Sequence, residues 1–385
     1  MLGLLNLSRF SAGIIAVLVG YTSSAAIIFQ AAEAAGATPE QISSWLWALG
    51  LGMGITCIGL SLKYRAPILT AWSTPGAALL VTSLEGVSMN EAIGVFIFCS
   101  VLITLSAVTG WFDKLMRFIP TSLATAMLAG VLFQFGLNMF SALEDQLLLV
   151  GLMLTTYLLM KQIMPRYVIP LTLAAGLALA GFQGTIHLDD LNWQITTPVF
   201  MMPEFSLQSL VGVGIPLFIV SMTSQYMPGL AALRANGYQT PASPLIGWTG
   251  FTGAVLAPFG GFSINLAAIT AAICASKEAD ADPQKRYFAS IWAGIFYCLT
   301  GIFGATVAAA FDAFPTALIV AIAGLALLGT IGNSLAASLG NESEREEALL
   351  TFMVTASGLT ILGVGSAFWG VVLGLAFHNL KRLAR

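Results

Sequence analysis

The segment APILTAWSTPGAALL, residues 66–80, is apolar enough for a membrane interior but cannot form one regular helix. No charged residue occurs from Ala66 through Leu84, yet the segment carries Pro67 near its start and a Pro75-Gly76 pair in its middle. A proline within a spanning helix removes a backbone hydrogen bond, and hydrocarbon offers no replacement for that bond. The segment therefore predicts a broken element at membrane depth.

The composition identifies the class of protein. Of the 385 residues, 57% are hydrophobic and only 9% are charged, and the mean hydropathy is +0.88. Soluble domains average about 25% charged residues, so this chain is too apolar for a water-exposed surface. The four cysteines lie in apolar segments without a C-x-x-C spacing, which favours buried thiols over a disulfide or a metal site. We expect a polytopic membrane protein whose first apolar segment is retained as an uncleaved span.

Apolar runs bounded by charges, Gly and Pro predict 14 membrane segments. Their expected ranges are 10–33, 41–62, 66–84, 91–111, 119–138, 146–162, 167–184, 207–233, 244–257, 258–276, 287–310, 315–336, 347–362 and 364–380. With both termini on one side, this count puts all 15 Lys and Arg residues on that side and leaves only acidic charges on the other. By the positive-inside rule both termini are expected in the cytoplasm.

Three internal matches relate the two halves of the chain. The stretch from Gly13 to Gly36 aligns with Gly214 to Gly237, PTSLATAMLAG (120–130) with PTALIVAIAG (315–324), and APILTAWST with APFGGFSIN (257–265). Small apolar residues also align by chance, but these matches keep their order and pair segments 1 with 8, 5 with 12, and 3 with 10. Seven is odd, so partners cross in opposite directions, as in inverted-repeat transporters. We predict an all-α membrane fold of 7+7 segments, with a first repeat over 1–184, an outer connection over 185–206 and a second repeat over 207–385.

The broken segments 3 and 10 are expected to present helix N-termini at mid-membrane. In segment 3, Thr74 is the expected N-cap, Pro75 the first helical residue and Gly76 a position of close approach, with LTAWS extended before them. In segment 10, PFGGF is a poor helix former and Ser263 is the expected N-cap. Helix N-termini attract anions, whereas an ordinary kink filled by neighbouring helices is the alternative for Pro75-Gly76.

Polar and aromatic residues around these breaks form the candidate substrate site. Segments 1 and 8 carry hydroxyl, amide and phenol groups at repeat-equivalent positions, where a polar group needs a partner or a substrate, although Ser and Thr also serve helix packing. The candidate residues are Tyr21, Thr22, Ser23, Ser24, Trp72, Ser73, Thr74, Gly76, Ser224, Gln225, Tyr226, Phe262, Ser263, Ile264 and Asn265. Amides, hydroxyls, ring faces and two helix ends suit a flat, aromatic, monoanionic ligand.

Several motifs resemble the benzoate/proton symporter family of bacterial inner membranes, the BenE type. They are VGYTSSAAIIFQAA, LTAWSTPGAALL, NEAIGVF, SPLIGWTG, LAAITAAIC and VTASGLT…GSAFWG, spread over essentially the whole chain. The resemblance implies proton-coupled import of benzoate, and a uracil-permease-like fold in which segments 3 and 10 each hold a short strand and a half-helix. Uracil-type relatives place acids in segments 8 and 10, where this chain has Gln225 and Ile264.

The candidates for proton coupling lie near outer helix ends and are Glu33, Glu85 and Asp312. The alternative is that the proton travels on the substrate carboxylate. The leading hypothesis is a secondary transporter for an aromatic carboxylate. The alternatives are a passive channel or facilitator for small anions, and a transporter of a nucleobase or inorganic anion. We expect no enzyme, cofactor, metal or nucleic-acid partner, because no nucleophile–base set, metal cluster or phosphate loop occurs; a homodimer remains an open alternative.

Overall fold

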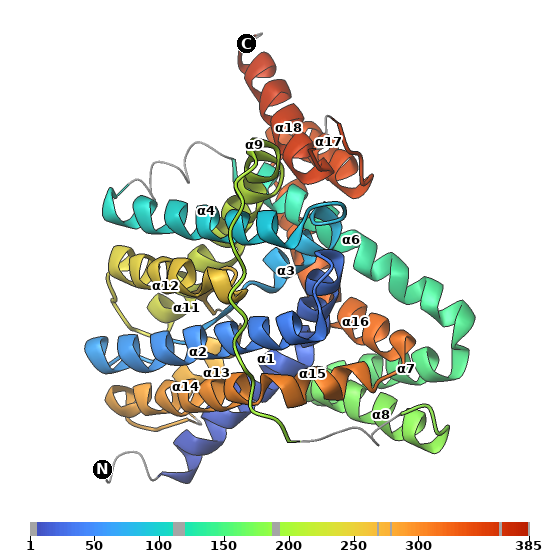
Figure 1. The fold of residues 1–385 in the computed structure, drawn as a ribbon. Coiled ribbons are helices and arrows are strands. Elements are labelled where there is room, and N and C mark those ends of the chain that lie inside the picture. Colours follow the sequence, from blue (N-terminus) through green and yellow to red (C-terminus); the bar gives the residue numbers. More distant parts are fainter. Residues whose placement is uncertain are drawn as a thin grey trace.

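A computed structural model describes residues 6–110, 120–186, 193–267, 269–277, 279–361 and 364–383. These residues are mostly helical (Figure 1). Within them, five helices are long and apolar enough to cross a membrane alone, and two bent helix pairs raise the number to seven. The other predicted segments are shorter or broken helices, and this explains why length alone undercounts the crossings.

The helices follow the predicted segments in order. The first half contains α1 (Leu7–Ala34), α2 (Pro39–Tyr64), β1 (Thr70–Trp72), α3 (Thr74–Ser83), α4 (Met89–Val108), α6 (Thr121–Asp145), α7 (Leu147–Ile163), η1 (Pro165–Tyr167) and α8 (Val168–Phe182). The expected end of segment 4 at 111 and the expected start of segment 5 at 119 lie outside the described residues.

The second half repeats this pattern with more interruptions. It contains α9 (Leu207–Ser209), η2 (Leu210–Gly214), α10 (Ile215–Ser221), η3 (Met222–Tyr226), α11 (Met227–Ala235), α12 (Ala242–Leu256), η4 (Ala257–Phe259), β2 (Ile264–Leu266), α13 (Ile269–Ala275), η5 (Pro283–Lys285), α14 (Tyr287–Ile302), α15 (Gly304–Asp312), α16 (Thr316–Leu339), η6 (Glu342–Glu344), α17 (Arg345–Ala356) and α18 (Ser366–Leu383). Residues 207–235 run as one long helix with two π-helical turns.

Two groups of helices surround the middle of the molecule. In the first group α1, α2, α3, α4, α12, α13 and α14 pack on one another, and in the second α6, α7, α8, α16, α17 and α18 do so. Figure 1 shows the second group on the right and at the top of the view. α1 and α3 of the first group also contact α16 and α6 of the second, so the two groups share a boundary near the breaks.

The broken segments meet in a two-stranded antiparallel sheet. Thr70 of β1 pairs with Leu266 of β2, Ala71 with Asn265 and Trp72 with Ile264. Backbone groups in a membrane interior need protein partners, and each strand supplies them to the other. The expected extended stretch before Pro75 is thus present as β1, and its partner is the equivalent stretch of the other repeat.

Both expected helix caps differ from the structure. The N-cap of α3 is Ser73 rather than Thr74, because the Ser73 hydroxyl accepts the Gly76 N–H at 2.9 Å. Ser263 caps no helix: it has a φ of 46° and precedes β2. Since Ile264–Leu266 are used for strand pairing, α13 begins only at Ile269.

Of the predicted outer connection, residues 185–186 and 193–206 are described, and residues 193–206 are extended. Its backbone is fastened to helices of both halves: Thr196 N–H donates to the Ile302 carbonyl at 2.8 Å, and Glu204 N–H donates to the Asn90 carbonyl at 2.9 Å. Ser44 of α2 accepts the Val199 N–H at 2.9 Å. Figure 1 shows this segment crossing the front of the molecule over α2 and α4.

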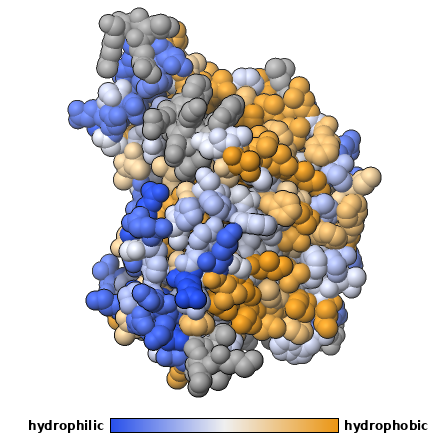
Figure 2. Space-filling model, turned by 90° about the vertical axis from the view of Figure 1, so that its left-hand side faces the viewer, coloured by the Kyte–Doolittle hydropathy of each residue, from blue (hydrophilic) through white to orange (hydrophobic). Residues whose placement is uncertain are grey.

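The surface fits a lipid environment. Large hydrophobic side chains are exposed on α4 and α12, among them Leu105, Val108, Trp248, Phe251 and Val255. Figure 2 shows a broad hydrophobic area beside a band of hydrophilic residues on one face. Such an area would be too large for a monomer in water, and it matches a membrane-facing belt.

Candidate functional site

A cavity of about 740 Å³ lies where the two helix groups meet at the breaks. It is lined by residues of α1, α3, α13 and α14 from the first group, of β1 and the long helix 207–235, which pack on that group, and of α6, α8 and α16 from the second. Five of the residues expected from sequence lie in this lining: Ser24, Trp72, Thr74, Ser224 and Gln225. The strand crossing positions Trp72 and Thr74, because β1 ends at Trp72 and α3 begins two residues later.

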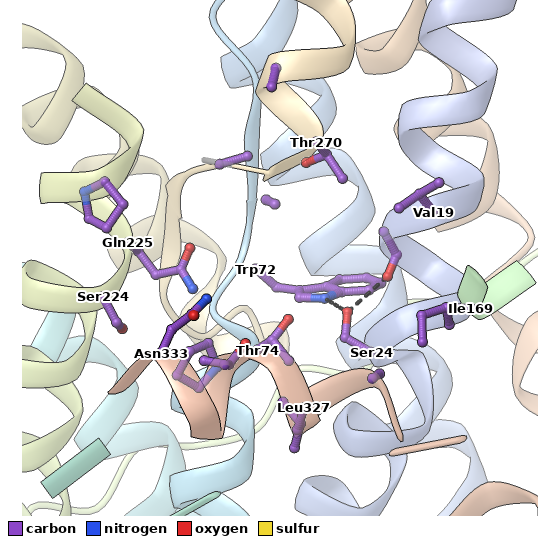
Figure 3. A pocket seen from close by; sticks show the side chains of 18 of the residues that line it. Val19, Ser24, Trp72, Thr74, Ile169, Ser224, Gln225, Thr270, Leu327 and Asn333 are labelled. Carbon is purple, nitrogen blue, oxygen red and sulfur yellow. Dashed lines mark hydrogen bonds between the residues drawn. The ribbon is translucent and has the colours of Figure 1, made fainter. Parts of the chain in front are cut away.

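Trp72 forms an aromatic wall of the cavity. Its indole N–H donates to the Ser24 hydroxyl at 2.7 Å, and Ser24 in turn donates to the Gly20 carbonyl at 2.8 Å (Figure 3). Tyr21 lies behind this wall, with its ring at 71° to the indole and 4.7 Å between centroids. The indole is therefore held in one orientation by packing and by a hydrogen bond, and its position is preorganised.

A π-helical turn places Ser224 and Gln225 at the cavity. The turn η3 covers Met222–Tyr226, and π-turns inside α-helices occur frequently at functional sites. The Ser224 hydroxyl donates to the Val220 carbonyl, so its proton is already used. In the described part of the chain no protein partner is found for the Gln225 amide, which points into the cavity in Figure 3.

The second helix group contributes residues that the sequence interpretation missed. Ala326, Thr330, Asn333 and Ala337 of α16 line the cavity at helical spacing, together with Thr125 and Leu128 of α6. Asn333 carries an amide within the predicted membrane segment 315–336. This amide could have identified the residue from sequence as a site candidate, since a polar amide is costly there without a partner. Figure 3 shows Asn333 on the same side of the cavity as Gln225, Ser224 and Thr74.

The other expected aromatic and apolar residues pack away from the lining. Tyr226 is fully buried and its hydroxyl bonds with Thr249 at 2.8 Å and with the Ile264 carbonyl at 3.0 Å. Phe262 is enclosed with Trp45 and Phe96 at centroid distances of 5.8 and 5.6 Å. Ile264 is buried, and the absence of a side chain at Gly52 leaves room for its end.

The expected polar residues outside the lining fall into two sets. The first set is buried and hydrogen-bonded where the two strands meet, and it consists of Ser73, Ser263 and Asn265. The Asn265 side-chain N–H donates to the Ser263 carbonyl at 2.7 Å, and the Ser73 backbone N–H donates to the same carbonyl at 3.1 Å. Thr22 bonds to the Leu18 carbonyl of its own helix, and Gly76 is buried in the first turn of α3. The Ser23 side chain lies outside the described part of the structure.

The cavity is electrically neutral over its described lining. Tyr297 is the one titratable side chain among the lining residues that the structure describes, and none of them is an acid, a Lys, an Arg or a His. Glu33 and Glu85 are exposed, at the end of α1 and after α3, and neither is a lining residue. The Asp312 side chain is outside the described residues. Within the described residues no group of His, Cys, Asp and Glu could hold a metal ion.

Comparison with known proteins decides the family. The family model described as "Benzoate membrane transport protein" (BenE) matches residues 3–380. The chain belongs to the BenE family of benzoate membrane transport proteins. Family membership makes it a membrane transporter and not an enzyme.

Two relatives of this BenE-family chain span nearly its full length. The inner membrane protein YdcO of Escherichia coli (strain K12) is 52% identical over 363 residues, covering 94% of this chain and 93% of the relative. The benzoate membrane transport protein of Acinetobacter baylyi (strain ATCC 33305 / BD413 / ADP1) is 42% identical over 370 residues, covering 96% and 94%.

Solved structures share the fold at low identity. The transmembrane domain of a cyanobacterium bicarbonate transporter, BicA, has a TM-score of 0.63 at 11% identity, over 96% of this chain and 97% of that chain. The murine anion transporter Slc26a9 in the inward-facing state has a TM-score of 0.60 at 13% identity, over 98% and 68%. With the β1–β2 crossing, these likenesses confirm the predicted all-α fold of 7+7 inverted segments broken at segments 3 and 10.

Proposed function

We propose that this BenE-family chain imports benzoate or a similar aromatic carboxylate together with protons, by alternating access across a bacterial inner membrane. The observation that carries this proposal is the neutral cavity between two helix groups, with amides and hydroxyls at one side and an indole wall beside them. Relatives described as a benzoate transporter and as an inner membrane protein support the substrate class and the location.

The two sides of the cavity suit the two parts of such a substrate. Thr74, Gln225 and Asn333 can hydrogen-bond a carboxylate, and Trp72, Val19 and Ile169 offer apolar and aromatic surface to a ring (Figure 3). Apolar pockets with a few convergent polar groups are typical of small-molecule sites. A ring stacked near an indole gains about 0.5–1.5 kcal/mol beyond its burial.

The neutral lining supports transport of the proton on the substrate. An ionised carboxylate that leaves water without a cation carries a large desolvation cost, whereas a protonated acid carries much less. We therefore favour proton movement with the substrate carboxyl group over Glu33, Glu85 or Asp312, which stay weaker candidates.

The cavity extends toward the basic side of the molecule. Its lining reaches Pro165 and Ser276, which are followed directly by Arg166 and Lys277 in sequence. With the positive side in the cytoplasm, this corresponds to an inward-open state with both termini cytoplasmic. The repeat boundaries 1–184, 185–206 and 207–385, and assembly as a homodimer, are parts of the same proposal.

A thermal-shift screen of the purified protein tests the substrate class. Benzoate is expected to raise the unfolding temperature in proportion to the logarithm of its concentration above Kd, and uracil and sulfate are expected to have no effect. Stabilisation by uracil or by sulfate, without stabilisation by benzoate, would refute the proposal.

The second candidate is a transporter or facilitator of small inorganic anions. It is favoured by the fold likeness to proteins titled as bicarbonate and anion transporters. Bicarbonate and chloride arms in the same screen separate it from the first, and a facilitator would give benzoate flux without accumulation.

A further inference from the structure

We propose that Asn333 determines substrate specificity by binding the carboxyl group from α16, on the same side of the cavity as Gln225 of the long helix 207–235 (Figure 3). The inference rests on the proposed transport of an aromatic carboxylate. It assigns to the second helix group a direct contact with the substrate.

The position of Asn333 carries the first step. α16 packs with α6, α7, α8 and α17, whereas Gln225 belongs to the long helix 207–235, which packs on α3, α4 and α13 of the first group. Both side chains line the same cavity, and Figure 3 shows their amides turned toward the same space beside Thr74. A ligand there would contact both helix groups at once.

The hydrogen-bonding state of the amides carries the second step. Over the described residues, neither amide has a protein hydrogen-bond partner, although each has two N–H donors and one carbonyl acceptor. Two neighbouring hydroxyls are already used within their own helix: Ser224 donates to the Val220 carbonyl and Thr223 donates to the Ile219 carbonyl. Asn333 is exposed and lines this cavity, where a bound ligand could satisfy its amide.

The chemistry of an amide carries the third step. An ionised carboxylate accepts the amide N–H, and a protonated carboxylic acid both accepts that N–H and donates its O–H to the amide carbonyl. Asn333 can thus hold either form of the substrate, which suits a cavity without fixed charge and a proton that travels on the ligand. A Lys or Arg at this place would retain only the ionised form.

Contact from both groups has a consequence for transport. When the groups approach to occlude the cavity, a carboxyl group between Gln225 and Asn333 satisfies both amides, whereas an empty cavity leaves them desolvated and unpaired. Leaving a buried polar group without a partner is costly, so closure is favoured by substrates that carry a group of this shape and polarity.

The experiment compares benzoate with benzamide in wild type, N333L and N333D. The probe is competition by each compound against radiolabelled benzoate on purified protein at pH 7. N333L removes the donors and is expected to weaken benzoate binding about 10-fold or more, since hydrogen bonds to charged groups are strong. N333D keeps the side-chain shape but replaces the amide with a carboxylate, which only accepts hydrogen bonds. The carboxylate repels benzoate and accepts the benzamide N–H, so the ratio of benzoate affinity to benzamide affinity is expected to fall about 100-fold.

The matched control is N138D, the same exchange on α6. Asn138 is exposed, accepts the Gln134 side-chain N–H at 2.9 Å and is outside the cavity lining. We expect N138D to keep the wild-type preference. Lowering the pH should restore benzoate binding in N333D as the introduced carboxyl group is protonated, an effect that a purely structural role of Asn333 would not produce.

The outcomes separate this inference from the proposed function. If wild type binds benzoate and N333D keeps the same preference and pH profile as N138D, the role of Asn333 is refuted and the transport proposal stands. If wild type binds no benzoate, the transport proposal itself fails. If N333D does not fold, the benzoate affinity of N333L is the deciding measurement. An affinity equal to that of wild type overturns the inference.

Discussion

A close backbone contact between α2 and α14 gives a quantitative prediction for Gly50→Ala. A Cβ atom built on Gly50 of α2 would lie 2.5 Å from the Gly301 Cα of α14, 2.7 Å from the Tyr297 carbonyl oxygen and 2.8 Å from the Gly301 nitrogen. These are backbone atoms that cannot rotate away. Restoring an ordinary contact of about 3.5 Å requires the two helices to separate by about 1 Å.

The expected cost follows from this overlap. Overpacking a filled interface destabilises by about 1–3 kcal/mol, and glycines at membrane helix contacts exist to permit close approach. Alanine itself favours a helix over glycine by about 1 kcal/mol. Gly59 lies on the same helix with no atom within 4 Å of its built Cβ, so G59A gains this propensity without the clash. The difference between the two variants, about 1–3 kcal/mol, therefore measures the clash alone.

Thermal unfolding of both variants in detergent tests the prediction. At an unfolding entropy of about 2.1 cal/mol/K per residue, 1 kcal/mol shifts the Tm of this 385-residue chain by about 1 °C, so G50A should unfold about 1–4 °C below G59A. Because Tyr297 lines the cavity, G50A should also weaken benzoate binding while G59A does not. Equal unfolding temperatures for G50A and G59A would refute the packing argument.

Two further variants test other parts of the structure. S73A should destabilise by about 0.5–2 kcal/mol through loss of the cap on the Gly76 N–H, whereas T74A should cost less; the reverse order in thermal unfolding would contradict the observed cap. At the basic end, burial raises the pKa of the Asp280 carboxyl, but hydrogen bonds from the Asp282 N–H and from Arg9, which is 2.6 Å away, lower it below its usual range. The ionised Asp280 carboxyl therefore stabilises the folded state fully above its pKa in the unfolded chain, about 3.9. This stabilisation is lost as the pH falls through its lower pKa in the folded protein. D280N should show a smaller loss of stability over that acidic range than wild type, and identical pH curves would exclude this role.

The course of the chain through the membrane was predictable from sequence because its signals are local. Hydropathy, charges and prolines mark each segment, and the asymmetry of Lys and Arg fixes the count. The break at Pro75-Gly76 was also visible, since proline cannot continue a hydrogen-bonded helix. Even the shortest predicted segment, 244–257, was located within a few residues of α12 (Ala242–Leu256).

The details of the breaks were less predictable because they depend on pairing between distant residues. Ser263 has the side chain of an N-cap, but Ile264–Leu266 pair with β1 and delay the helix to Ile269. Ser73 and Thr74 are chemically equivalent caps, and only the turn geometry chooses Ser73. Local propensity cannot resolve either choice.

Only part of the candidate site was predictable from sequence, because packing between distant residues decides which side chains face the cavity. Ser24, Trp72 and Gln225 follow from the repeat and from their polarity at mid-segment, and they do line the cavity. Phe262 and Tyr226 were equally attractive, but their side chains are used in packing. Asn333 was missed because the breaks and the repeat-related polar clusters pointed to segments 1, 3, 8 and 10, whereas Asn333 belongs to segment 12.

The most direct test of the account is benzoate uptake into liposomes that contain the purified protein. Under an inward proton gradient, radiolabelled benzoate should accumulate above equilibration by more than in protein-free liposomes, which report passive entry of the neutral acid. A protonophore should abolish this excess. Uptake that only equilibrates, or an excess that a protonophore leaves unchanged, would contradict proton-coupled transport.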